Sequence, residues 1–279
     1  MRFAPLISPL TTSLKKLVPV LLASPLLLLS GCFQVEEVVH LKTDGSGTIE
    51  ETCTMSSAAI AQIKQMQAGA AGANAKPVEL FDEAKLKEQA SKMGDGVTFV
   101  SAKKLKTPTG EGFAATFAFT DINKLKISPE PPSMGDGGTV TTDDSKAITF
   151  KFDKGHPAQL SINNPQSPKE DAAAAPKAPD AAADATSDAM GAMLMQALKD
   201  MRVTVRVETE GTIVNTNSAY KDGSKVTLFD VDFNKVLADP AKAKQLMKSQ
   251  DQTAESAKLL KTIPGIAFET ANPVIIKFQ

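Results

Sequence analysis

The chain has 279 residues and a formal net charge of −1, so it lacks the basic excess that nucleic-acid-binding domains carry. It contains no Trp and one Tyr, which argues against base stacking and against an aromatic platform for carbohydrate. We therefore expect no nucleic-acid partner.

The first residues have the pattern of a secretory signal. Residues 1–16 carry Arg2, Lys15 and Lys16 and no acidic residue, and an apolar run from Leu17 to Leu29 follows them. A membrane-spanning helix needs roughly 20 apolar residues, so this run is too short to be one. A charged start followed by a short apolar run is typical of a signal peptide.

The apolar run ends in small residues and a cysteine, Leu29-Ser30-Gly31-Cys32. This segment resembles the lipobox of bacterial lipoproteins. The resemblance implies that Cys32 receives a diacylglyceryl thioether, that cleavage falls between Gly31 and Cys32, and that the new amino group is acylated. Residues 1–31 would then be the signal peptide, and the membrane the first partner. The alternative is an ordinary signal peptide followed by a coincidental cysteine.

Covalent lipid determines where the protein is expected to reside. Two or three acyl chains hold a protein stably on a bilayer, whereas one holds it only marginally. We therefore expect a lipid-anchored protein of the cell envelope. Phe33, and not Asp, follows Cys32, and in Gram-negative lipoproteins an Asp there usually signals retention in the inner membrane. The resemblance thus favours the outer membrane if the organism is Gram-negative.

Two segments with alternating apolar residues, 33–41 and 49–55, flank the glycine-rich turn 44–47. Alternation with a period of two predicts a β-hairpin with one buried face. The turn also matches part of an EF-hand loop, but Lys42 and Cys53 stand where that loop needs an acidic residue and a bidentate Glu. We expect neither calcium nor another metal or cofactor.

Cys53 has no partner within the chain once Cys32 carries lipid, so a disulfide framework is excluded. Free cysteines are among the most buried residues, and we expect a buried core thiol here. A reactive or intermolecular thiol is the alternative.

The rest of the first part of the body, residues 32–164, alternates helical and extended patterns. Ser57 and Gly94 provide a helix cap and a helix stop. The predicted elements are a helix at 57–66, a flexible connector at 68–77, a helix at 82–93, strands at 97–105 and 112–120, a loop at 128–146, and strands at 148–152 and 160–162.

Residues 165–189 are dominated by Ala and Pro and predict a disordered insertion, because they can bury little apolar surface. The second part of the body, residues 190–279, follows. Its predicted elements are a methionine-striped core helix at 190–201, a strand at 203–207 continuing through 211–217, a turn at 220–225, a strand at 226–233, a helix that begins at Pro240 and continues, with or without a break, to Leu260, and a strand at 274–278.

Segments 116–125 and 227–236 echo each other in sequence. Within them, we expect Asp121 and Asp232 to end a strand and begin a helical turn. A catalytic role is the alternative, but neither has a histidine or a second carboxylate at motif spacing. The two histidines, His40 on the polar face of the first strand and His156 in a turn, are expected at the surface.

Together the elements predict an α+β fold, mainly an antiparallel β-sheet built from hairpins, with several amphipathic helices packed on it. The lipobox, the hairpin turn 43–48, and segments 211–217 and 225–228 resemble bacterial envelope lipoproteins of the LppM type. Phe229 stands near the place where a Trp is expected in that family. The resemblance implies a small α+β body at the membrane surface and carries over no catalytic residues.

Three functions are compatible with these patterns. The first is a non-enzymatic, lipid-anchored protein that binds an amphiphile or another envelope component. The second is an assembly factor whose sheet edge pairs with a partner strand. The third is an envelope hydrolase, which the sequence supports least because it has neither an HExxH nor a GxSxG motif.

Overall fold

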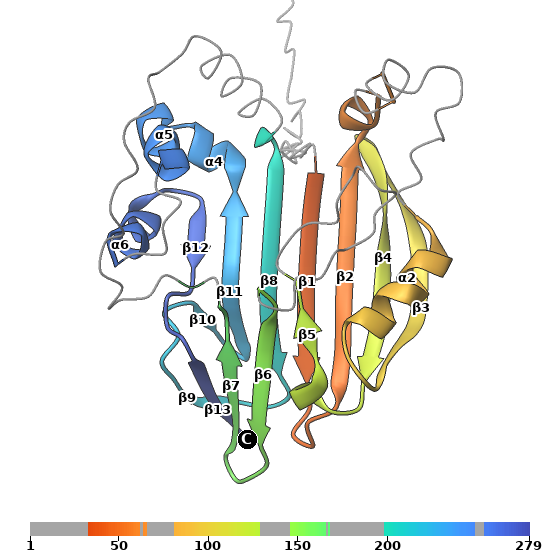
Figure 1. The fold of residues 1–279 in the computed structure, drawn as a ribbon, viewed down its shortest axis with the longest axis vertical. Coiled ribbons are helices and arrows are strands. Elements are labelled where there is room, and N and C mark those ends of the chain that lie inside the picture. Colours follow the sequence, from red (N-terminus) through yellow and green to blue (C-terminus); the bar gives the residue numbers. More distant parts are fainter. Residues whose placement is uncertain are drawn as a thin grey trace, which may run out of the picture.

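The computed structural model describes residues 33–61, 64–65, 81–128, 146–165, 167, 198–248 and 254–279. Over these residues the chain forms two β-sheets, with helices beside them (Figure 1). The larger, sheet A, has the order β10 (Lys221–Asp222), β11 (Lys225–Asp232), β8 (Met201–Thr209), β1 (Phe33–Leu41), β2 (Gly47–Ser56), β4 (Gly110–Phe119) and β3 (Val97–Thr107), with β12 (Ile266–Phe268) paired to β11. Sheet B has the order β5 (Lys126–Ile127), β6 (Ile148–Asp153), β7 (Ala158–Asn163), β13 (Val274–Phe278) and β9 (Ile213–Thr216).

Strand pairing is antiparallel throughout the described residues, except between β1 and β8, which run parallel. The prediction of a mainly antiparallel α+β fold is therefore confirmed. The parallel pair brings the N-terminal strand into the middle of sheet A, between β8 and β2.

The β1–β2 hairpin forms where alternation predicted it. Gly45 adopts a positive φ of 90°, which a side chain would disfavour. A Cβ on Gly47 would collide with the backbone oxygen of His40. The turn therefore needs glycine at both positions, and this fixes the register of the two strands.

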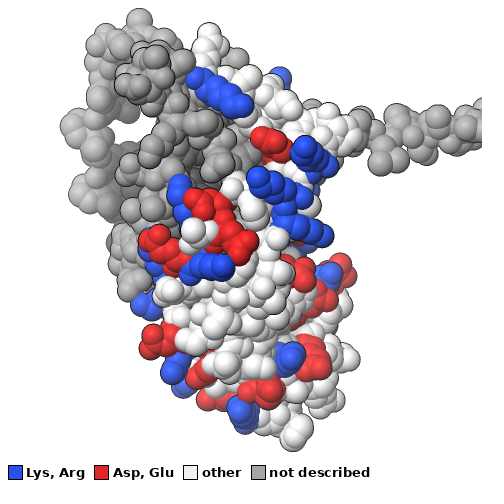
Figure 2. All heavy atoms as spheres, turned by 90° about the vertical axis from the view of Figure 1, so that its right-hand side faces the viewer, with Lys and Arg blue, Asp and Glu red and all other residues white. Residues whose placement is uncertain are grey.

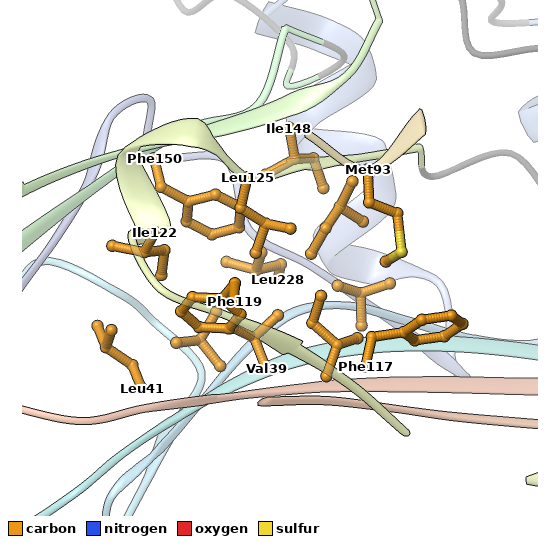
Figure 3. Packing of buried hydrophobic residues seen from close by; sticks show 14 of the residues in the cluster. Val39, Leu41, Met93, Phe117, Phe119, Ile122, Leu125, Ile148, Phe150 and Leu228 are labelled. Atoms are coloured by element: carbon orange, nitrogen blue, oxygen red, sulfur yellow. The ribbon is translucent and has the colours of Figure 1, made fainter. Parts of the chain in front are cut away.

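The core lies between the two sheets, and we call the face of sheet A that looks toward sheet B its inner face. Figure 3 shows Val39 and Phe119 of sheet A packed toward Phe150 and Ile122. Val39 and Phe117 are completely buried. Since sheet B covers the lower part of sheet A in Figure 1, this apolar packing occupies the end of the sheet opposite the start of β1.

Helix α2 (Glu83–Lys92) packs on the inner face of sheet A. Asp82 caps it by accepting hydrogen bonds from the backbone N–H groups of Ala84 and Lys85. Its Leu86 and Ala90 are buried in the core. The helix predicted at 82–93 is thus confirmed.

The other helices do not form the layer that the sequence predicts. Residues 57–61 are helical, and a short 3-10 turn, η2 (Ile122–Lys124), follows β4. Three short helices pack on one another beside β11 and β12 around a small cluster of Val236, Ala243 and Ile263. They are α4 (Phe233–Leu237), α5 (Pro240–Lys248) and α6 (Ala254–Thr262). Several amphipathic helices packed on the sheet are therefore not confirmed.

The segment predicted as one strand from 203 to 217 is divided between the two sheets. β8 ends at Thr209 in sheet A, and β9 belongs to sheet B. Gly211 between them has a φ of +90° and lies against the backbone of Gln279, so the chain turns there from one sheet to the other. Met201 belongs to β8 and not to a helix.

Several sequence predictions lie wholly or mostly outside the described residues. They are the signal peptide 1–31 with Gly31 and Cys32, the connector at 68–77, most of the loop at 128–146, the insertion at 165–189 and most of the helix at 190–201. No helix within the described ranges is long and apolar enough to cross a membrane.

Candidate functional site

The polar residues singled out from the sequence do not come together. Asp121 caps η2 and Asp232 caps α4, as predicted, but they stand at opposite ends of sheet A. His156 is exposed in the turn after β6. His40 lies on the outer face of sheet A, where its ring nitrogens are 3.7 Å from Glu50 and 3.6 Å from Glu208.

A different pair of polar residues faces the interior. Glu37 of β1 and Glu51 of β2 are directly opposite each other in the antiparallel ladder. Each shares its alternation with buried apolar residues of its own strand, such as Val39 and Ile49, so both side chains point to the inner face. Opposed side chains in such a ladder have Cβ atoms roughly 5 Å apart, and two like charges at that distance repel.

The surroundings of this carboxyl pair are apolar. Across the sheet, the same row continues with Val205 of β8 next to Glu37 and Ala115 of β4 next to Glu51. The next row toward the start of β1 contains Cys53, which is 4 % exposed. The pair therefore interrupts the apolar inner face of sheet A, with core residues on both sides of it along β1 and β2.

The two carboxyl groups differ in their hydrogen bonds. Glu51 is 5 % exposed, and its Oε2 accepts a 2.7 Å hydrogen bond from Nε2 of Gln89 on α2. Glu37 keeps part of its surface accessible, yet its Oε1 is buried and has no hydrogen-bond partner. An unpaired buried carboxyl oxygen is costly, so Glu37 is the polar group of this face that a hydrogen-bond donor would stabilise most.

Burial changes the protonation of both groups. Desolvation, reinforced by the charge of Glu51, raises the pKa of Glu37 from 4.5 to about 8. Desolvation also raises the pKa of Glu51, while the hydrogen bond from Gln89 opposes this. Both pKa shifts therefore favour the protonated form of the pair. It can donate a hydrogen bond as well as accept one.

Cys53 is not an activated nucleophile. Desolvation and the nearby charge of Glu51 raise the pKa of its thiol to about 12. Its side chain points to the inner face, whereas His40 lies on the outer face, so the two do not form a catalytic pair. The expectation of a buried core thiol is confirmed.

The described part of the chain contains no group of three or more His, Cys, Asp or Glu side chains placed to hold a metal ion.

Sequence reasoning overlooked the pair although a signal was present. Glu37 and Glu51 occupy positions of the same parity as the apolar residues of the two alternating segments. An acidic residue at a core position in each of two adjacent strands indicates a buried carboxyl pair.

Comparison with known proteins gives little further information. No protein-family model matches the chain, and a search of curated proteins finds no match. Among solved structures, the chain is similar to the folded domain of LppM from Mycobacterium tuberculosis, determined by NMR. The two share 9 % sequence identity with a TM-score of 0.33, over 89 % of this chain and 90 % of that one. This likeness is too distant to support a functional argument.

Proposed function

We propose that the chain is a lipid-anchored, non-enzymatic protein of a bacterial cell envelope that binds an amphiphile on the inner face of sheet A. The observation that carries this proposal is the unpartnered, buried Oε1 of Glu37 opposite Glu51 on an otherwise apolar strand face. Small-molecule sites commonly combine an apolar lining with a few placed polar groups.

The chemistry of the pair suggests what part of the amphiphile it contacts. A protonated Glu37 and the carboxyl group of Glu51 together offer a donor and acceptors to one ligand group. A hydroxyl or an amide complements such a set without bringing a charge into the apolar surroundings. Val35, which lies on the same face of β1 and keeps part of its surface accessible, would contact the hydrocarbon part of the same molecule.

The proposed anchor at Cys32 would be only a few residues from this face along the chain. β1 begins at Phe33, directly after the cysteine of the lipobox-like segment, and Glu37 follows four residues later on the same strand. A tether this short would hold the carboxyl pair near the membrane, where amphiphiles are concentrated.

The test compares lipid retained by the purified protein with lipid bound through Cys32. The protein is isolated from envelopes, extracted with organic solvent, and both fractions are measured by mass spectrometry. Glu37→Leu should lose the extractable lipid yet unfold at higher urea concentration, because it removes an unpaired polar atom. Glu50→Gln, on the outer face of β2, should keep the lipid. A wild-type protein that carries only its covalent lipid would refute amphiphile binding.

Pairing of a sheet edge with a partner strand is the alternative function. The edge strand β3 is long enough for this, but it has a bulge between Phe99 and Ser101 and exposes Lys103, Lys104 and Lys106. Bulges and lysines both oppose pairing at a sheet edge. These features favour amphiphile binding over strand addition.

A further inference from the structure

The lysines of the edge strand are distributed unevenly along it. Lys103, Lys104 and Lys106 all lie in the second half of β3, whereas the first half, Val97 to Ala102, contains no charged residue. All three lysines are exposed. Protection of a sheet edge against pairing does not require charges at one end only.

These three lysines are not neutralised by acidic partners. The ion pairs of the described residues include none with Lys103, Lys104 or Lys106, although Glu111 is opposite Lys106 across the ladder. By contrast, Lys87 and Lys92 on neighbouring α2 each pair with a glutamate one turn earlier. The Nζ of Lys104 lies 5.4 Å from the centre of the Phe81 ring.

The register of sheet A places the lysines at the end where the chain enters the fold. Phe33 is opposite Met55, Met55 is opposite Glu111, and Glu111 is opposite Lys106. Lys106 is therefore three strand spacings from Phe33 in the same row, or about 14 Å at roughly 4.8 Å per spacing. Figure 2 shows Lys and Arg gathered toward the upper end of the face that carries α2 and β3, with both signs mixed below.

We propose that Lys103, Lys104 and Lys106 form a membrane-contact patch that binds the anionic headgroups of the bilayer in which the chain is anchored. A lipid chain on Cys32 would place Phe33 at the headgroup level, and the row that contains Lys106 lies at the same height. A basic cluster near an anionic bilayer gains electrostatic free energy for each lysine. The patch gives the body a contact with the membrane besides the anchor, and this contact fixes the rotation of the body about the anchor. The proposed amphiphile binding does not require this contact.

The test measures lysine accessibility in the lipidated protein. The purified protein is reconstituted in vesicles of phosphatidylcholine, with or without phosphatidylglycerol, and labelled with an amine-reactive reagent before mass spectrometry. Lys103, Lys104 and Lys106 should react several-fold more slowly when phosphatidylglycerol is present. The exposed lysines Lys151, Lys154 and Lys221, on other strands and turns, should react equally in both.

Added salt should remove the protection, because the contact is electrostatic. An environment-sensitive dye attached at Thr107→Cys, an exposed position next to the patch, should report a difference between the vesicles when the three lysines are present and no difference when all three are changed to Gln. Equal labelling of the patch in both vesicles would overturn the proposal. If the triple Gln variant forms dimers and the wild-type lysines show no lipid-dependent protection, the lysines instead protect the sheet edge against pairing, and the proposal is overturned.

A second experiment tests the patch independently of the anchor. If mass analysis finds no acyl chain on Cys32, flotation of the same protein with phosphatidylglycerol vesicles replaces the labelling. The wild-type chain should then float about a hundredfold better than the triple Gln variant at low salt, while the variant of Lys151, Lys154 and Lys221 should float like wild type. Equal flotation of all three would overturn the patch.

Discussion

Nε2 of Gln89 donates a 2.7 Å hydrogen bond to Oε2 of Glu51 and thereby links α2 to the middle of sheet A. We expect Gln89→Leu to destabilise the fold by about 1–3 kcal/mol, because a buried acceptor loses its partner. Urea unfolding measures this change. Glu88→Gln, at an exposed neighbouring position of the same helix, should change stability by only a few tenths of a kcal/mol. Similar losses in both variants would contradict the importance of the Gln89 contact.

The stability of the protein should fall as the pH rises through neutrality. The pKa of Glu37 is raised from 4.5 to about 8, so between these pH values the unfolded chain loses a proton that the folded chain keeps. Each proton lost only on unfolding favours the unfolded state as pH increases, and the decline should level off above about pH 8. Glu37→Gln should flatten this dependence in unfolding curves measured from pH 5 to 9. A wild-type stability that increases over this window would contradict the burial of Glu37.

Cys53 should be inert while the protein is folded. Its thiol has a pKa raised to about 12 by burial and by the charge of Glu51, so almost no thiolate exists at neutral pH. Iodoacetamide should add one label in urea and none under native conditions, as read by intact mass. Rapid native labelling would show that the inner face near the carboxyl pair opens readily.

Glu269 should contribute strongly to the fold at the other edge of the molecule. It is 3 % exposed, its Oε2 accepts hydrogen bonds of 2.7 Å from Ser218 Oγ and 2.8 Å from Ala219 N, and its Oε1 accepts one of 2.9 Å from Ala271 N. Glu269→Ala leaves three donors unpaired and should cost about 3 kcal/mol in urea unfolding. Glu111→Ala, at an exposed position of β4, serves as the control and should be nearly neutral.

Processing at Cys32 can be checked directly on the protein made in a bacterial host. We expect the mature chain to begin at Cys32 and to carry added mass from acyl chains. Cys32→Ser should prevent this addition and release the protein from the membrane fraction or leave the signal peptide attached. A wild-type product of unmodified mass in the soluble fraction would contradict the proposed anchor.

Local patterns in the sequence were sufficient where one segment determines its own structure. The turn around Gly45 and the helical turns that begin at Asp121 and Asp232 followed from short-range chemistry, and all three are present in the structure. The two similar segments, 116–125 and 227–236, also form the same kind of local structure. Asn123 accepts a backbone hydrogen bond from Phe152, and Asn234 accepts one from Asp200, so each ties a capped turn to another part of the chain.

The pairing of strands that are far apart in the sequence could not be predicted from local patterns. β1 is hydrogen-bonded to β8 in parallel, with Phe33 opposite Met201, and no local pattern encodes a contact across that sequence distance. For the same reason the sequence did not predict that the chain turns from sheet A to sheet B at Gly211. An extended segment has the same alternation of apolar residues whichever sheet it joins. The carboxyl pair was predictable in principle, because each glutamate occupies a core position of its own strand.

The central position of β1 has a mechanical consequence. Its nine residues, Phe33–Leu41, are paired along their whole length with β2 on one side and β8 on the other. A pull applied at Phe33 acts along the strand, so the hydrogen bonds to both neighbours bear the load together in shear instead of opening one after another. If Cys32 carries the proposed lipid anchor, a body attached through this strand should resist detachment better than one attached through a strand at the edge of a sheet.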